Sequence, residues 1–328
     1  MLVQASHCDR AQPVYLSPPT RCWHWLHACG NVIFFLFVVS MLAVSAFPTS
    51  PAPSGNANAS PAPEGGAREI SDFYALIREY WAALSSEGAS ERSIMLNFGY
   101  WRPGMTALHE AQAAFLARIL AEVSAAPAAQ QGLEIGCGIG GISVNVLRQQ
   151  PGVHMTGVDI SLDQLALARS NALEHGVQER FEALQGNSMD LPFADAQFDF
   201  TLCIESSFHY EDKPQFLREA FRTLKPGGHA VVADITCRKP ERVRFRQGNY
   251  FEAPEQYLEW MAQAGFELVG WEDFGAQVYA PLHQCVLDFN RQHRSQVGKY
   301  WALVLNNYRE LAAAGDMGYC LFSLRRPL

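Results

Sequence analysis

The sequence predicts an α/β protein built on a doubly wound, parallel sheet, and three observations carry that prediction. From residue 131 onward, short apolar runs typical of strands alternate with segments of helical periodicity. The stretch LEIGCGIGG, Leu133 to Gly141, follows the first of those runs and is rich in glycine. The chain is 48% hydrophobic and 18% charged, which suits a globular protein with a sizeable core. Alternation at this spacing places helices on both faces of the sheet.

The first 66 residues differ in composition from the rest. NVIFFLFVVSMLAVSA, Asn31 to Ala46, has the length of a signal-peptide core and is short for a bilayer crossing. Pro48 to Gly66 is a Pro/Ala/Ser/Gly linker that is expected to be disordered, because it cannot bury a core. Three interpretations stay open: an export signal, a membrane tether, or an extension outside the working protein. We therefore divide the chain into 1–66, a hydrophobic leader and linker, and 67–328, a folded domain.

Two N-terminal helices and a loop are expected ahead of the sheet. EISDFYALIREYWAALS, residues 69–85, has apolar residues at helical spacing. NFGYWRPG, Asn97 to Gly104, is an aromatic loop that ends on Pro and Gly. Thr106 is a plausible N-cap for a helix over the next apolar stretch, which extends to residue 123.

The remaining pattern predicts seven strands with helices between them. The strands are expected over 131–135, 154–159, 181–185, 198–205, 229–235, 266–273 and 319–325. The helices are expected over 141–150, 162–175, 213–224, 254–264 and about 281–313. The last of these belongs to a helical cap, about residues 276–315, inserted before the final strand.

Charge and cysteine usage exclude several classes of function. The net charge of −8 argues against a nucleic-acid partner. The densest basic run, Arg238 to Arg246, is either a solvated surface or a contact for an anionic substrate group. The eight cysteines show no framework spacing, so reduced thiols are expected. CWHWLHAC, Cys22 to Cys29, resembles a metal site only in composition, and no metal is expected.

The glycine loop points to a nucleotide-containing ligand. Gly136, Gly138 and Gly141 form Gly-x-Gly-x-x-Gly, which is also the dinucleotide fingerprint. Asp159 ends the second strand 159 − 136 = 23 positions after Gly136, near the expected spacing of about 20 for an acid that binds ribose. Glu134 occupies a position that is usually apolar in a nicotinamide fingerprint and could hold an amino group. After the third strand, Asn187, Ser188 and Met189 could frame a purine.

Four motifs in order carry a resemblance to a known family. LEIGCGIGG, VDIS, GNSMDLPFADAQFDF and LKPGG together resemble the class I S-adenosylmethionine-dependent methyltransferases, over roughly residues 71–326. The resemblance implies a Rossmann-like fold and S-adenosyl-L-methionine as cofactor, with its methionine part on the glycine loop, ribose on the acid and adenine on the third-strand loop. The implied cofactor residues are Glu134, Gly136, Cys137, Gly138, Asp159, Ile160, Gln164, Asn187, Ser188, Met189 and Ile204.

The segment from Glu205 to Asp234 resembles the small-molecule branch of the family. That branch includes rebeccamycin-type sugar and polyketide O-methyltransferases and the tocopherol and quinone methyltransferases. His209 lies in the place of the catalytic histidine and Asp234 in the place of its acid. If the fourth and fifth strands are neighbours, both face one cleft, and a histidine oriented by a carboxylate is a suitable general base. Glu205 is expected either to contact the cofactor or to stabilise a cation during carbon methylation.

The acceptor molecule is expected to be small and partly apolar. Tyr100, Trp101 and Tyr210 are candidate substrate contacts, although Tyr210 departs from the more common methionine. Oxygen is the first choice of acceptor atom, carbon on a prenyl or quinone-like skeleton the second, and nitrogen the third. A catalytically silent cofactor-binding module is the alternative of another class. Because the cofactor is intracellular, a cytoplasmic domain is expected, with membrane association through residues 31–46, export and a homodimer left open.

Overall fold

The structure is a computed structural model that describes residues 64–125, 130–245 and 248–328. The interpretations of the hydrophobic stretch, of CWHWLHAC and of the linker up to residue 63 lie outside the described part, so they stay predictions. The last three residues of the expected disordered linker, Glu64, Gly65 and Gly66, instead begin the helix α2 (Glu64–Ser86). Among the described helices, none combines the length and the apolar character needed to cross a membrane.

Seven strands form one sheet, as the sequence predicts. In the order β3-β2-β1-β4-β5-β7-β6, the five strands from β3 to β5 pair in parallel, while β7 is antiparallel to both neighbours. The strands are β1 (Gln131–Ile135), β2 (His154–Asp159), β3 (Phe181–Gln185), β4 (Phe198–Ile204), β5 (Leu224–Cys237), β6 (Glu267–Asp273) and β7 (Met317–Arg325).

The prediction of a wholly parallel sheet is therefore wrong at its last strand. Asp273, at the end of β6, pairs with Cys320, near the start of β7. The intervening cap thus leaves and re-enters the sheet at the same end, and a strand that returns from that end must run antiparallel to the one before it.

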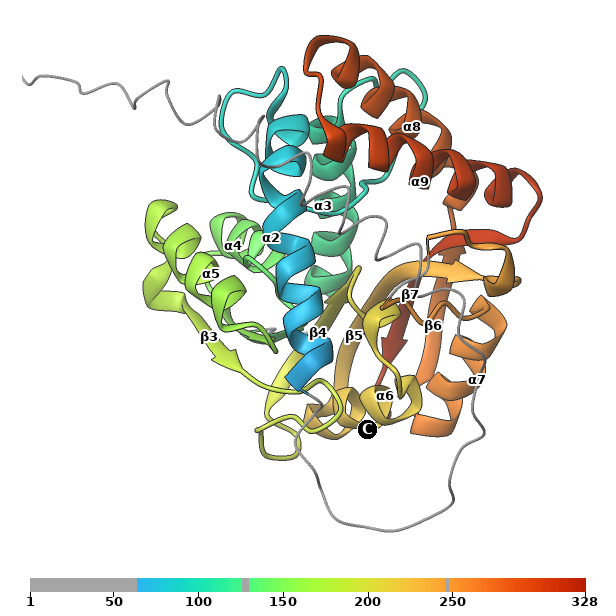
Figure 1. The fold of residues 1–328 in the computed structure, drawn as a ribbon. Coiled ribbons are helices and arrows are strands. Elements are labelled where there is room, and N and C mark those ends of the chain that lie inside the picture. The colour runs from blue at the N-terminus through green and yellow to red at the C-terminus, as the bar shows by residue number, and fades with distance from the viewer. Residues whose placement is uncertain (1–63, 126–129, 246–247) are drawn as a thin grey trace, which may run out of the picture. The chain divides into compact units, whose positions relative to one another are not determined.

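Helices cover both faces of the sheet, as expected for a doubly wound fold (Figure 1). In β5, Val231, Ala233 and Ile235 join the larger core cluster, whereas Ala230 and Val232 join the cluster that contains residues of α6 and α7. This alternation follows from the two-residue period of a strand. The helices are α2 (Glu64–Ser86), α3 (Leu108–Ala125), α4 (Gly141–Gln149), α5 (Leu162–Glu174), α6 (Lys213–Thr223), α7 (Pro254–Ala264), α8 (Gly275–Gln292) and α9 (Gln296–Ala313).

Three helix predictions need correction. The long helix expected over 281–313 is two helices, because Ser295 caps a new one by accepting a hydrogen bond from the Gly298 N–H at 2.9 Å. Thr106 lies too early to be the N-cap of α3, and the Glu110 carboxylate instead accepts hydrogen bonds from the backbone N–H groups of Thr106 and Ala107. Helix α2 begins at Glu64, slightly before the predicted domain boundary.

Candidate active site

A cavity of about 210 Å³ lies where the glycine loop follows β1, beside the ends of β2 and β4. This is the edge at which parallel α/β sheets bind ligands. All the cofactor residues predicted from the sequence line it: Glu134, Gly136, Cys137, Gly138, Asp159, Ile160, Gln164, Asn187, Ser188, Met189 and Ile204. The loop motifs are separated in sequence but meet at this one place.

Gly136 shows why the loop requires glycine. Its φ of 73° is in the left-handed region, and a Cβ built there would lie 1.8 Å from Ser206 Oγ and 2.6 Å from the Tyr210 hydroxyl. The backbone N–H groups of Gly136 and Cys137 both donate to the Val158 carbonyl, at 2.8 and 3.0 Å. A side chain at position 136 would therefore displace the loop from the neighbouring strand end.

Asp159 connects the second strand to the glycine loop. Its Oδ2 accepts a hydrogen bond from the Gly138 N–H at 2.9 Å, and its Oδ1 accepts one from the Ser161 N–H at 2.9 Å. The N-cap of α5 is Ser161, so Asp159 does not serve as a helix cap. Nearby, Gln164 Oε1 is buried without a hydrogen-bond partner among the described residues, which suits a site completed by a ligand.

Glu134 is an acid buried at the base of the cavity. It is 2% exposed and accepts hydrogen bonds from the backbone N–H (3.0 Å) and the hydroxyl of Ser143, in the first turn of α4. Burial raises the pKa of Glu134 to about 7, although the bonds from Ser143 oppose that shift. A positively charged group in the cavity would restore its ionised form.

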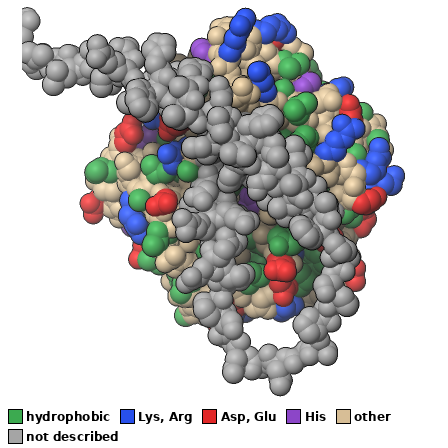
Figure 2. Space-filling view, in the orientation of Figure 1, with side chains coloured by type: hydrophobic (Ala, Val, Ile, Leu, Met, Phe, Trp, Pro, Cys, Tyr) green, Lys and Arg blue, Asp and Glu red, His purple; other side chains and the backbone are tan. Residues whose placement is uncertain are grey.

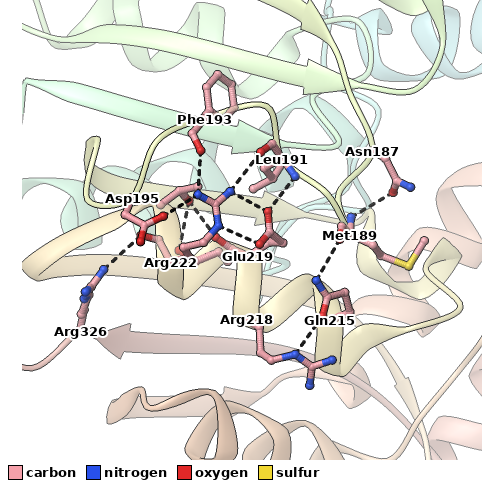
Figure 3. Close-up of polar contacts among 12 residues, drawn as sticks. Asn187, Met189, Leu191, Phe193, Asp195, Gln215, Arg218, Glu219, Arg222 and Arg326 are labelled. Atoms are coloured by element: carbon pink, nitrogen blue, oxygen red, sulfur yellow. Dashed lines mark hydrogen bonds and ion pairs between the residues drawn. The ribbon is translucent and has the colours of Figure 1, made fainter. Parts of the chain in front are cut away.

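The loop after β3 is fixed by residues that the sequence reasoning missed (Figure 3). Asn187 Oδ1 accepts from the Met189 N–H at 3.0 Å, and the Met189 carbonyl accepts from Gln215 Nε2 at 3.1 Å. Further along, Arg222 donates to the Leu191 and Phe193 carbonyls and pairs with Glu219, as Figure 3 shows. Gln215 and Arg222 lie on α6, far along the chain from the loop that they hold. The sequence alone therefore does not show these hydrogen bonds, which become visible only when α6 packs against the loop.

Glu205 has an unusual backbone conformation. Its φ of 47° is rare for a residue with a side chain and marks local strain of the kind found at functional sites. Its Oε1 accepts hydrogen bonds from the Phe98 N–H at 2.6 Å and from the Tyr319 hydroxyl. Burial raises the pKa of Glu205 to about 8. The carboxyl group is thus held by two segments far away in the sequence.

His209 lies on the short 3₁₀ helix η3 (Ser207–His209) after β4. Its Nδ1 is 3.0 Å from the Gly248 carbonyl oxygen, and its Nε2 is 3.1 Å from the Tyr74 hydroxyl on α2. Because a carbonyl only accepts, Nδ1 carries the proton, and Nε2 is the acceptor for the tyrosine. Burial lowers the pKa of His209 to about 4, so the imidazole is neutral at pH 7.

The expected pairing of His209 with Asp234 is wrong. The strands β4 and β5 are neighbours, but Asp234 is fully buried, and its Oδ2 accepts hydrogen bonds from the hydroxyls of Ser207 and Tyr257. Strand alternation turns its side chain toward α7, away from His209. Asp234 lines neither described cavity and instead holds Ser207, the first residue of the turn that carries His209.

Two of the three expected substrate contacts lie elsewhere. The Tyr100 hydroxyl donates to Glu272 Oε1 at 3.1 Å, and Trp101 is buried with its indole N–H donating to the Phe98 carbonyl at 2.8 Å. Neither residue lines a described cavity, because the preceding turn brings Asn97 and Phe98 to the site instead. Tyr210 does line the main cavity, with its hydroxyl 2.7 Å from Ser206 Oγ.

A second cavity, of about 60 Å³, adjoins the first. The two share Tyr74, Leu96, Glu205 and His209. The other lining residues are mostly aromatic or aliphatic: Ile77, Trp81, Phe98, Phe208, Ile235, Phe245, Asn249, Tyr300, Trp301, Val304 and Tyr308. Helix α9 supplies four of them, which agrees with the expected cap, whereas the contribution of α2 was missed.

Three members of the basic run near the end of β5 are paired with acids. Arg238 lies 2.6 Å from Glu255, and Lys239 and Arg242 both pair with Asp316. On the face seen in Figure 2, Lys and Arg side chains are interspersed with acidic ones. Arg246 is outside the described residues. None of the described basic residues of this run lines a cavity. This favours the interpretation of the run as a solvated surface over its interpretation as a contact for an anionic substrate group.

As predicted, Cys137, Cys203, Cys237, Cys285 and Cys320 are free thiols. Among the residues that the structure describes, no group of three His, Cys, Asp or Glu side chains could hold a metal ion.

Comparison with known proteins identifies the family. Residues 133–232 match the family described as a methyltransferase domain. The chain is 31% identical over 188 residues to an O-methyltransferase from Aspergillus nomiae, covering 54% of this chain and 83% of that protein. It is 34% identical over 147 residues to erythromycin 3''-O-methyltransferase from Saccharopolyspora erythraea, covering 45% of this chain but only 48% of that enzyme.

Solved structures share the fold. The cyclase SpnF matches with a TM-score of 0.66 and 24% identity, covering 80% of this chain and 96% of SpnF. A putative sarcosine dimethylglycine methyltransferase from Galdieria sulphuraria matches with a TM-score of 0.66 and 18% identity, covering 76% and 97% of the two chains. The chain carries the glycine loop and an acid at the end of the second strand, and it is similar in sequence to these methyltransferases. It therefore belongs to the class I S-adenosylmethionine-dependent methyltransferase family.

Proposed function

We propose that the chain methylates an oxygen atom of a small, partly apolar molecule, with S-adenosylmethionine as the methyl donor and His209 as the proton acceptor. The observation that carries this proposal is the place of His209 at the junction of the two cavities. Its Nδ1 is fixed by the Gly248 carbonyl, so Nε2 is the basic atom. The Tyr74 hydroxyl, 3.1 Å from Nε2, marks where a substrate hydroxyl could donate.

The main cavity fits the cofactor. Glu134 would hold its ammonium group, Asp159 its ribose hydroxyls, and the loop from Asn187 to Met189 its adenine. The orphaned Gln164 Oε1 supplies an acceptor that no described residue satisfies. When bound, S-adenosylmethionine supplies a sulfonium methyl group that is already activated. The protein must then align the acceptor and accept its proton.

The electrostatics of His209 suit that task. Its lowered pKa keeps the imidazole neutral across the physiological pH range, so the Nε2 lone pair is free to accept a proton, and the negative charge of an ionised Glu205 in the same cavity would be needed to raise its basicity toward the operating pH. The Gly248 carbonyl would stabilise the imidazolium that forms when Nε2 takes the proton. Asp234 does not contact the ring, so we propose that it acts as a positioning residue, through Ser207.

Carbon methylation is the second candidate, and Glu205 favours it. Its carboxyl group lines both cavities, and its strained conformation is maintained by Phe98 and Tyr319. In that position a carboxylate would stabilise a cation on a prenyl or quinone-like acceptor. A silent cofactor-binding role is the third candidate, and the similarity in fold to the cyclase SpnF is the observation that favours it.

Mass spectrometry of products distinguishes these candidates. The full chain is incubated with S-adenosylmethionine and a panel of phenols, sugars, polyketides and prenyl compounds. A product heavier by one methylene unit, with the methyl located on oxygen by fragmentation, supports the proposal. A methyl on carbon supports the second candidate, and cofactor binding without any product supports the third.

His209→Ala tests the proposed base. Turnover should fall by about 10²–10⁴-fold, because that is the usual contribution of a general base, while affinity for S-adenosylhomocysteine is preserved. His293→Ala, at a surface histidine, is the matched control. A His209→Ala enzyme with nearly normal turnover would show that the proton is accepted elsewhere.

We also propose that the domain works in the cytosol, where S-adenosylmethionine is made. A fusion of residues 1–66 to a reporter tests this point, and an exported reporter would contradict it.

A further inference from the structure

Acidic side chains line the two cavities, and a cation bound beside them would favour their ionised forms. Glu134, Asp159 and Glu205 line the main cavity, and Glu205 also lines the second. Among the described residues that line either cavity, none is a lysine or arginine. Lys213 lies close by, but its ammonium group donates to the carbonyls of Tyr210 and Tyr250. An anionic group on the acceptor molecule would therefore find no counter-ion among the described lining residues.

The second cavity is walled by aromatic rings. The ring centroids of Trp81 and Trp301 are 4.7 Å apart, and Phe98 lies 5.6 Å from Trp81 and 6.0 Å from Trp301. Phe245 and Tyr300 add an edge-to-face pair at 5.7 Å. Such walls bury planar, apolar groups, and their ring faces attract a cation.

Glu205 offers one carboxylate oxygen to this space. Both of its hydrogen bonds, from Phe98 and Tyr319, reach Oε1. Within the described part of the chain, no hydrogen bond reaches Oε2. Because the residue lies at the junction of the cavities, this oxygen is available to a group of the acceptor molecule that sits beside His209.

We propose that the acceptor molecule is a ring-bearing basic amine, recognised by pairing of its ammonium group with Glu205 between aromatic walls, while its hydroxyl group faces His209. The inference rests on the proposed function for the identity of the reacting group. A compound of the same shape with a carboxylate or phosphate in place of the amine is rejected, because that anion would face Glu205 with no lysine or arginine among the described lining residues to balance it.

Three matched ligands test the inference by calorimetry on the full chain saturated with S-adenosylhomocysteine. Serotonin, hydroxytryptophol and hydroxyindoleacetate share one hydroxyindole ring and differ in carrying an ammonium, an alcohol or a carboxylate. Serotonin should bind about 10-fold or more tightly than the alcohol, as expected for a charge-assisted hydrogen bond, and the carboxylate should bind most weakly. Equal binding of amine and alcohol, preference for the carboxylate, or binding of none of the three would overturn the inference.

Glu205→Gln should remove the preference for the amine, whereas Glu310→Gln, at an exposed acid on α9, should keep it. An amine preference that survives in Glu205→Gln would overturn the assignment of Glu205. The ranking of the three ligands by the unaltered chain decides the matter even if the variant does not fold. If the amine preference is found but no ligand is methylated, the proposed function fails and the recognition stands. If the ligands are methylated but the amine binds no more tightly than the alcohol, the proposed function stands and the inference about amine recognition fails.

Discussion

The two halves of the site are built in opposite ways. The cofactor half comes from consecutive loops after β1, β2 and β3, and its key groups are glycine backbone and acids within residues 134–189. The acceptor half comes from α2, the loop around Phe98, the turn η3, the segment around Asn249 and α9, and its walls are mostly aromatic side chains. A site made from backbone at strand ends can be recognised in a short sequence motif, whereas one made from distant side chains cannot.

The same contrast applies to how the halves tolerate substitution. In the cofactor half, positions such as Gly136 leave no room for any side chain. In the acceptor half, rings pack against rings, and truncating one of them opens a cavity that its neighbours fill only in part. Substitutions in the two halves should therefore produce separable effects, on the cofactor and on the acceptor respectively.

The largest effect is expected at Gly136. Gly136→Ala should weaken binding of S-adenosylhomocysteine by about 100-fold or more, because its Cβ would overlap Ser206 and force the loop away from the cavity. Isothermal calorimetry measures this. Gly176→Ala is the matched control, since Gly176 has a similar φ of 69° but nothing within 4 Å of an added Cβ. Equal loss in the two variants would mean that a general effect of a side chain at a left-handed glycine, and not overlap with Ser206, weakens binding.

A somewhat smaller effect is expected at Asp159. Asp159→Ala should weaken cofactor binding about 10- to 100-fold, because charge-assisted hydrogen bonds to the ribose and to Gly138 are lost. Asp163→Ala, at an exposed acid in the first turn of α5, serves as the control for calorimetry. An unchanged dissociation constant for Asp159→Ala would remove Asp159 from the cofactor half.

The acceptor half should respond differently. Tyr300→Ala should raise the KM for the acceptor by up to about 10-fold, the value of an aromatic contact, and leave affinity for S-adenosylhomocysteine unchanged. Leu303→Ala, on the exposed face of the same helix, should change neither. Steady-state kinetics and calorimetry together check this. If Tyr300→Ala alters cofactor affinity, the halves are coupled and the comparison fails.

The smallest effect concerns stability and pH. Burial raises the pKa of Glu205 to about 8, above its ordinary value, so the folded protein binds more protons than the unfolded chain between about pH 4.5 and 8. Stability should therefore fall as pH rises through 8, and Glu134, with a pKa of about 7, adds to this trend. In Glu205→Gln the fall in thermal midpoint between pH 6.5 and 9 should be smaller, by a few degrees. Parallel curves for the two proteins would place Glu205 in a more solvated setting.

The sequence by itself determined the seven strands, the glycine loop and the predicted residues that the structure brings together at the main cavity. Each depends on local order: strand periodicity, the turn that only glycine permits, and the acid that directly follows a strand. Parallel strands place their carboxyl ends at one edge of the sheet. Gly136, Asp159 and Asn187 lie at or just after the ends of three such strands, so they are expected to lie close together.

Only the tertiary structure decided which groups surround His209 and the second cavity. It turned Asp234 to the other face of the sheet, gave His209 a carbonyl and a tyrosine as partners, and brought Trp81 and Trp301 together from positions 220 residues apart. It also reversed β7, since the cap returns to the sheet at the end it left. These outcomes depend on which faces of α2 and α9 pack over the sheet. That packing is decided by contacts among residues throughout the core, so it cannot be predicted from a local sequence pattern.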